Sequence, residues 1–446
     1  MDDTQFLSSD PGDLVIFNQV MMKFEAQSGA LLSRDRKTKV MGLGKWQGKI
    51  DWPQEVQWIQ SVNSLDVLGF KVYPKFKDTL KYTWDKVFRG VQKSLFAWEC
   101  RLLFTLQDRV TVAQTFALSK MWYIAQLLPL PSGIAKKIES AVSSFMFRGR
   151  HERLKLSELQ HPSASGGLGL TCVATKAESL LLRQSLRILS RTNQNCYRHL
   201  GHWLGHFLQE GFPGLRQQGP VCQTVQPQYL LHTAILEALQ EGLVRLEFTP
   251  TTLGQETTKK IYAGRIADIL TPPKVEQQFP AIDFHDLVYP RLKNLVLEPG
   301  PRDTLYCLVH GLYRNRARLY RQNRAPDPFC PVPECHQAVQ DRVHMFCSCT
   351  RVVEAWLWLR ARLLQLMPHT VGGMGTSSEE FLLLQYPKDT LDKECLWLMG
   401  NYVEIVDSVA VKKNKKLRVD QLRGILRERL QGMASRAVIR PNIFNI

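Results

Sequence analysis

Apolar residues recur at helical spacing along most of this chain, so the pattern predicts a mostly α-helical protein. Large apolar side chains share one face of the helix expected after residue 83: Trp84, Val87, Phe88, Val91, Leu95 and Trp98. Basic residues lie largely off that face, as is typical of a helix that packs on a core with one side. Helices are also expected at about 109–127, 133–147, 175–191 and 303–322, and from Trp356 to Pro368.

The N-terminal stretch is the part of the chain with a β signal. Residues 67–73, Val-Leu-Gly-Phe-Lys-Val-Tyr, are expected to form a short strand. Before it, the turn from Asp10 to Asp13 caps a helix that Gly29 ends. Apolar side chains fall at helical spacing in this helix: Leu14, Phe17, Val20, Met21 and Phe24.

Local patterns predict helices in the C-terminal part and a boundary between domains. Ser377 and Glu380 have the spacing of a capping box that opens a helix. Two helices are expected between Leu391 and Leu430, joined around a basic segment. Glycine and proline gather at residues 211–228, which predicts a domain boundary. The division predicted from these patterns is 1–74, 75–210, 211–302, 303–370 and 371–446.

Charge and composition narrow the classes of partner. The net charge of +17 implies an acidic partner. Nucleic acid is the favoured partner, and an anionic membrane surface is the lesser option. No apolar run reaches the roughly 18 residues of a membrane span, and the N-terminus lacks a signal peptide. The ten cysteines are therefore expected in a reducing compartment, where clustered cysteines more often bind metal than form disulfides. The expected location is nuclear or cytoplasmic, without secretion and without a membrane partner.

A cysteine and histidine cluster carries the clearest chemistry. Cys330, Cys335, His344 and Cys349 can close a tetrahedral site, and thiolate with imidazole favours Zn²⁺ over Mg²⁺ or Ca²⁺. The order Cys-Cys-His-Cys resembles a zinc knuckle with a widened first spacer. Cys347 is a rival fourth ligand. The alternative is a chance cluster of unpaired thiols.

Basic residues gather in three places that predict nucleic-acid contact. The helix before the cluster carries Arg314, Arg316, Arg318, Arg321 and Arg324, and its tyrosines at seven-residue spacing are Tyr306, Tyr313 and Tyr320. Arginine forks bind phosphate and aromatic faces stack on bases. The other groups are Lys81, Lys86, Arg89 and Lys93, and then Lys412, Lys413, Lys415, Lys416 and Arg418. Solvated arginines with inward tyrosines, or a nuclear-localisation patch in the tail, are the alternatives.

Short motifs follow one another along most of the chain. They are Met1-Asp2-Asp3, Ser28-Gly-Ala-Leu-Leu-Ser, Leu68-Gly69, Ser119-Lys120-Met-Trp-Tyr123, Pro129-Leu-Pro131, Phe145-Met-Phe-Arg-Gly149, Gly166-Gly-Leu-Gly-Leu170 and His310-Gly311, then the metal cluster and Trp356. In this order they resemble the C-terminal half of a LINE-type (non-LTR) retrotransposon reverse transcriptase. The resemblance implies a palm remnant, a helical thumb, a helical linker, a zinc-binding segment and a basic tail for the five predicted regions.

The resemblance also implies a role for the first residues. Asp2 and Asp3 match the paired catalytic aspartates of the palm, but polymerases hold two metal ions with carboxylates from separate strands. The earlier palm strand is absent from this sequence, so Asp2 and Asp3 are expected to be inactive, with Mg²⁺ bound only if the missing palm is supplied. The expected function is that of a truncated fragment that binds RNA or an RNA–DNA hybrid and holds a structural Zn²⁺. The alternatives are part of an active RNA-directed DNA polymerase in a longer product, or a host-adopted helical scaffold for proteins.

Overall fold

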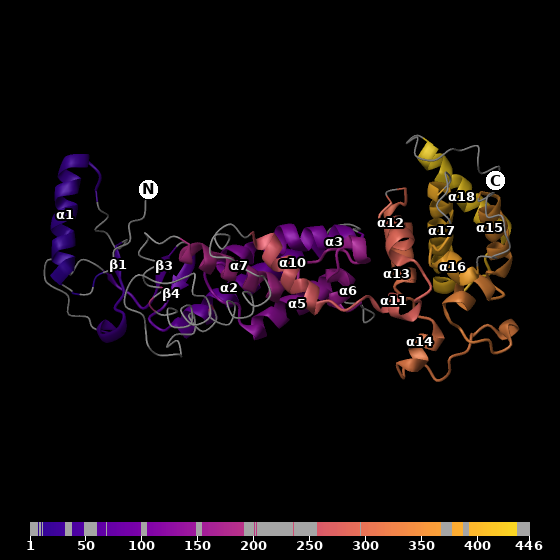
Figure 1. The fold of residues 1–446 in the computed structure, drawn as a ribbon, viewed down its shortest axis with the longest axis horizontal. Helices are drawn as coiled ribbons and strands as arrows, with labels where there is room; N and C mark the ends of the chain where they lie inside the picture. Colours follow the sequence, from indigo (N-terminus) through magenta and orange to yellow (C-terminus); the bar gives the residue numbers. More distant parts are fainter. Residues whose placement is uncertain are drawn as a thin grey trace. The chain divides into compact units, whose positions relative to one another are not determined.

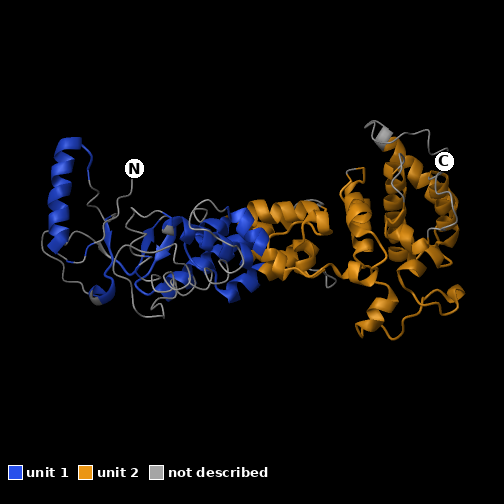
Figure 2. Cartoon of the chain, in the orientation of Figure 1, with its two compact units in different colours: residues 1–92, 120–138, 174–264 blue, residues 93–119, 139–173, 265–446 orange. Residues whose placement is uncertain are grey.

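The protein is mostly α-helical, as the sequence predicts (Figure 1). The computed structural model describes residues 8, 10, 12–31, 38–48, 60–67, 69–99, 105–148, 154–190, 200, 202, 235, 257–294, 296–366, 377–386 and 392–434. The chain divides into two compact units, residues 1–92, 120–138 and 174–264 and residues 93–119, 139–173 and 265–446 (Figure 2). No helix in the described ranges is long and apolar enough to cross a membrane.

The elements up to residue 189 are mainly helices with two small sheets. The helices are α1 (Gly12–Ser28), α2 (Phe76–Glu99), α3 (Leu106–Val112), α4 (Ser119–Ala125), α5 (Ser132–Phe147), α6 (Leu156–Gln160) and α7 (Val173–Leu189). Short 3-10 or π-helical pieces are η1 (Gly44–Trp46), η3 (Ala113–Leu118) and η4 (Ser163–Ser165). The strands are β1 (Lys39–Val40), β2 (Gln60–Ser61), β3 (Leu65–Val67) and β4 (Phe70–Val72).

The two sheets differ in direction. β1 pairs with β2 in parallel, whereas β3 and β4 form an antiparallel hairpin in which Leu65 lies opposite Val72 and Val67 opposite Phe70. The single strand expected over residues 67–73 is therefore wrong, because the chain reverses within it. Gly69 has a φ of +91°, a left-handed conformation that glycine adopts without the penalty of a Cβ atom.

Helix α1 forms where the sequence predicts it but does not bury the predicted apolar face. Asp10 accepts the N–H of Gly12 at 2.8 Å, and Gly29 follows the helix with a φ of +72°. Leu14 is buried, yet the side chains of Val20 and Phe24 are 57% and 50% exposed. Helical spacing and caps are local, whereas burial requires an element packed on that face, which the described residues do not supply.

Helix α2 buries three of the six predicted stripe residues, and Val87, Phe88 and Trp98 are half-buried. Trp84 is fully buried and its indole N–H donates to the Pro129 carbonyl at 2.8 Å, so the tryptophan both fills the core and satisfies its polar atom. Val91 and Leu95 are also buried. All four basic residues predicted to lie largely off this face are exposed: Lys81, Lys86, Arg89 and Lys93.

A carboxylate from a distant segment caps helix α3. Thr105 and Asp108 form a capping box at the start of this helix. Both carboxylate oxygens of Asp303 also lie 3.0 Å from the amide nitrogen of Leu106, so they accept a further N–H of the first turn. Burial raises the pKa of Asp303 to about 6, although the Leu106 amide and Arg109 act in the opposite direction.

This raised pKa makes stability depend on pH. Because the folded pKa of Asp303 lies above the unfolded value, the native state binds the proton more tightly, and this group lowers stability as pH rises from about 4 to about 6. Asp303→Asn keeps an acceptor for the Leu106 N–H and removes the charge. The free energy of unfolding of the variant relative to wild type should therefore grow by up to about 3 kcal/mol between pH 4 and pH 7. Urea unfolding across this range measures it, and parallel stability curves would contradict the assignment.

The remaining elements belong largely to the C-terminal part. The helices are α10 (Thr258–Ile269), α11 (Lys274–Gln278), α12 (Tyr289–Leu292), α13 (Pro299–Val309), α14 (Arg316–Arg321), α15 (Val353–Leu366), α16 (Ser378–Leu382), α17 (Asp392–Val406) and α18 (Val419–Ala434). The 3-10 and π-helical turns are η6 (Phe284–Val288), η7 (Pro333–Cys335), η8 (His344–Ser348) and η9 (Asp407–Lys412).

Helix α17 is the centre of this C-terminal bundle. It contacts α13, α15 and α18 (Figure 1), and most of its side chains are buried, Trp397 and Tyr402 completely. The predicted apolar face of α15 is buried at all four positions, Trp356, Leu359, Leu363 and Leu366. The predicted capping box of Ser377 and Glu380 opens α16. The predicted pair of helices around the basic segment is also present.

The long helix expected over residues 303–322 is wrong, because it is two helices. Helix α13 ends at Val309, and Gly311 turns the chain with a φ of +63°. Asn315 then accepts the N–H of Arg318 and begins α14. The predicted tyrosine stripe is broken by this turn: Tyr306 is buried, whereas Tyr320 is 48% exposed.

Candidate metal centre

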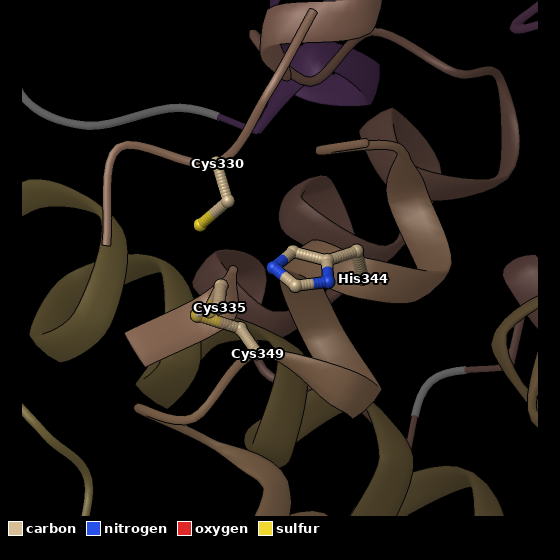
Figure 3. A group of neighbouring side chains, drawn as sticks. All are labelled: Cys330, Cys335, His344 and Cys349. Carbon is tan, nitrogen blue, oxygen red and sulfur yellow. Dashed lines mark hydrogen bonds between the residues drawn. The ribbon is translucent and has the colours of Figure 1, made fainter. Parts of the chain in front are cut away.

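The predicted ligands converge in space. The ligand atoms of Cys330, Cys335, His344 and Cys349 all lie within 4.8 Å of one another, and all four residues are buried (Figure 3). The sulfur atoms of Cys335 and Cys349 are 3.7 Å apart. A tetrahedral ion with Zn–S bonds of about 2.3 Å separates two sulfur ligands by roughly 3.8 Å. The group can therefore hold a metal ion.

Short turns bring the first two cysteines together. Cys330 donates its N–H to the Ala338 carbonyl at 2.8 Å, beside a bridge between Phe329 and Val339. Cys335 closes the 3-10 turn η7, which begins at Pro333. The next two residues, His336 and Gln337, have φ values of +46° and +59°, and this left-handed pair returns the chain toward the bridge. The local fold is thus a tight loop around the sulfur atoms.

The imidazole is oriented by its neighbours. His344 begins the π-helical turn η8, and its backbone N–H donates to the Asp341 carboxylate at 2.7 Å. Its Nδ1 lies 3.4 Å from the Ser348 hydroxyl, whereas its buried Nε2 has no hydrogen-bond partner among the described residues. Burial lowers the pKa of His344, which favours the neutral form that binds metal. Nε2 is therefore the ring nitrogen available to a metal ion, and Ser348 contacts the other ring nitrogen.

Polar side chains lie close to two of the sulfur atoms. The Thr350 hydroxyl lies 3.5 Å from the Cys335 sulfur, and the side-chain nitrogen of Gln340 lies 4.0 Å from the Cys330 sulfur.

Burial and hydrogen bonding both shift the pKa values of the three ligand thiols. Burial raises the pKa of Cys330, and it raises that of Cys349 to about 12. Burial also acts on Cys335, but the hydrogen bonds from Thr350, Cys349 and Cys330 outweigh it and lower the pKa of that thiol. A bound cation supplies the positive charge that three clustered thiolates need, so the donor set suits a metal.

Cys349, not Cys347, joins the ligand group. Cys347 is buried, and burial raises its pKa strongly, although Ser378 acts in the opposite direction. In the same turn the Tyr402 hydroxyl donates to the Phe346 carbonyl at 2.6 Å, which attaches η8 to α17. The Cys347 side chain is thus part of the packing between η8 and the bundle.

Helix α14 is attached to the metal loop through one glutamine. Gln340 accepts the N–H of Arg316 with its side chain at 3.1 Å and that of Ala317 with its carbonyl at 3.2 Å. Its amide nitrogen lies 4.0 Å from the Cys330 sulfur. The predicted phosphate-binding arginines occupy this helix and its flanks: Arg314, Arg321 and Arg324 are exposed, and Arg316 and Arg318 are half-buried. Their position beside the metal group follows from Gln340, which the sequence interpretation missed.

Tyr313 lies between α13 and α14 and is half-buried. Its ring packs edge-on against Phe346, with 4.9 Å between ring centroids.

The tail lysines also lie beside the metal group. Lys412, Lys413, Lys415 and Lys416 are exposed, and the Leu417 N–H within the same segment donates to the Arg351 carbonyl at 2.9 Å. Arg351 was not predicted as functional. The available signal was its place two residues after Cys349, where a backbone amide can reach a ligand sulfur.

The other predicted residues are not part of this site. Lys86 and Arg89 are exposed on α2. They lie in the part of this helix, up to Gln92, that belongs to the first unit. Asp2 and Asp3 lie outside the described residues.

No protein-family model and no curated protein matches the chain.

Proposed function

We propose that the second compact unit, the C-terminal unit that ends at residue 446, binds nucleic acid, either RNA or an RNA–DNA hybrid. The proposed contact is a basic surface that a structural Zn²⁺ holds in place. The basic surface consists of the exposed arginines around α14 and the basic segment Lys412–Arg418. One observation carries the proposal: both parts are hydrogen-bonded to the loops that hold the Cys3His group, α14 through Gln340 and the basic segment through Arg351.

Zinc is the ion that this donor set supports best. Thiolate and imidazole ligands favour Zn²⁺ over Mg²⁺ or Ca²⁺, which prefer oxygen. Three cysteines and one histidine complete a tetrahedron and leave no position for a substrate, which is the arrangement of structural zinc sites. The proposed role of the metal is therefore to fix the loops between α14 and α15.

Charge and chemistry support nucleic acid as the partner. The chain has a net charge of +17, and phosphate neutralisation is the main source of affinity for basic proteins of this kind. Arginine forks bind phosphate oxygens in pairs. The motif order that resembles a LINE-type reverse transcriptase favours RNA or a hybrid over duplex DNA.

A matched pair of tyrosines tests the proposed surface. Tyr320→Ala should weaken single-stranded RNA binding by about 1–3 kcal/mol with little change in melting temperature, because an exposed ring can stack on a base. Tyr313→Ala should instead lower the melting temperature, because it removes a ring packed against Phe346. Fluorescence anisotropy and thermal unfolding of both variants measure these effects.

The opposite result, with RNA affinity lost in Tyr313→Ala and unchanged in Tyr320→Ala, would place the nucleic acid elsewhere. Wild-type protein without RNA affinity near 100 mM salt would contradict the function itself.

A helical scaffold for proteins is the second candidate. The observation in its favour is the exposed apolar side chains of α1 and the residues after it: Ile16, Val20, Met22, Phe24 and Leu31. Apolar clusters of this kind are typical of protein contacts. Salt-dependent RNA affinity separates the two candidates, because a scaffold does not require it.

A further inference from the structure

We propose that metal binding at the Cys3His group holds the basic segment Lys412–Arg418 against the start of α15, so that zinc occupancy controls the segment's contribution to nucleic-acid binding. The docking of the segment is independent of any ligand. Its effect on affinity rests on the proposed nucleic-acid function.

Arg351 lies in the turn after the metal group and contacts the basic segment. It lies two residues after the ligand Cys349, and its carbonyl accepts the Leu417 N–H at 2.9 Å. Its guanidinium donates to the Asn414 side chain. One residue in the turn after a metal ligand thus contacts the basic segment at two points.

Other contacts attach the first half of the segment to η9: Lys412 pairs with Asp407 at 2.5 Å, and the Lys415 N–H donates to the Val409 carbonyl at 3.1 Å. Leu417 is completely buried, whereas its neighbours Lys412–Lys416 and Arg418 are exposed. Lys416 forms an exposed ion pair with Glu354 at 2.7 Å, and such pairs contribute little to stability. Leu417 and Asn414 therefore attach the segment to the turn before α15, and both contact Arg351.

Loss of the metal should act on this attachment before it acts on the helices. Residues 330–349 form short turns rather than long helices, so their arrangement depends on the bound ion. The turn after Cys349, which contains Arg351, then loses the constraint that the ion places on Cys349. Helix α15 keeps its buried face, including Trp356 and Leu359, and stays packed on α17. The expected outcome is a local release of the basic segment.

Hydrogen exchange of the full chain tests the release directly. Protein loaded with Zn²⁺ is compared with protein treated with a chelator. The Leu417 amide should exchange at least about tenfold faster after chelation, whereas the amides of α17 should change by less than about threefold. Unchanged exchange at Leu417 would overturn the proposal, and equal loss of protection in α17 would contradict a local release.

Thermodynamic reciprocity supplies a second arm that leaves the ligands intact. If the metal favours docking, docking must favour the metal by the same factor. Asn414 has a φ of +56°, so Asn414→Gly suits the backbone and removes only the acceptor for Arg351. The Zn²⁺ affinity, measured by competition with a chromophoric chelator, should fall by about tenfold.

The matched control is Asn323→Gly, at a φ of +55° after α14. Its Zn²⁺ affinity should equal that of wild type. Equal Zn²⁺ affinity in Asn414→Gly and Asn323→Gly would overturn the coupling.

RNA binding separates this inference from the proposed function. With an oligouridylate probe, Lys413→Gln should weaken binding by the zinc-loaded chain and have at least threefold less effect on the chelated chain. Release at Leu417 without any RNA affinity would remove the nucleic-acid function and leave the docking intact. RNA affinity with an equal Lys413→Gln effect in both forms would retain the function and overturn the proposed control by zinc.

Discussion

Cys335→Ser should abolish zinc binding and destabilise residues from about 325 to 360, whereas Cys347→Ser should keep the metal. Cys335 places its sulfur 3.7 Å from that of Cys349 within the ligand group, and a serine hydroxyl cannot replace a thiolate there. In small zinc domains metal binding supplies about 10–16 kcal/mol of folding free energy, so this loss should be the largest single-residue effect in the C-terminal unit.

Cys347→Ser is the matched control, because Cys347 is equally buried but packs against the bundle. It should cost about 1–3 kcal/mol for the buried hydroxyl and leave the metal content unchanged. Elemental analysis should give one zinc per wild-type chain, one for Cys347→Ser and none for Cys335→Ser. A wild-type protein without zinc, or zinc retained in Cys335→Ser and lost in Cys347→Ser, would contradict the assignment.

The second large effect concerns RNA affinity. Lys413 and Lys415 are exposed in the basic segment, and each phosphate contact to a single strand contributes about −0.7 to the slope of log affinity against log salt. The double change to glutamine should therefore flatten the slope by about 1.4. At 100 mM salt this corresponds to a roughly 25-fold weaker affinity, relative to an extrapolated 1 M reference.

The control is the same double change at Lys86 and Arg89, which are exposed on α2. It should have a clearly smaller effect on both slope and affinity if the metal-side surface is the main contact. Anisotropy titrations at several salt concentrations give both quantities. An equal or larger effect at α2 would move the RNA to the first unit.

The sequence predicts those elements whose signals are local. The predicted buried face of α15 is confirmed at Trp356 and Leu363, because the residues of a single packed face repeat with helical spacing. The break before α14 was missed although Gly311 and Asn315 carry the signals for an end and a start. Basic and aromatic periodicity continued across the turn and concealed it.

Burial is less predictable than helicity, since it depends on what another segment places on a face. Helix α1 has the caps and spacing of a helix, yet Phe24 is half exposed. The choice between Cys347 and Cys349 has the same cause. Spacing from His344 permits either, and the packing of η8 on α17 turns Cys347 toward the bundle.

RNA affinity of the full chain with and without zinc tests the central claim most directly. A fluorescent oligouridylate is titrated with zinc-loaded protein and with chelated protein near 100 mM salt. The zinc-loaded chain should bind, and chelation should weaken binding by at least about tenfold, because the loops that carry Gln340 and Arg351 lose their fixed positions. Absence of binding by the zinc-loaded chain, or the same affinity in both forms, would contradict a nucleic-acid surface built on the metal.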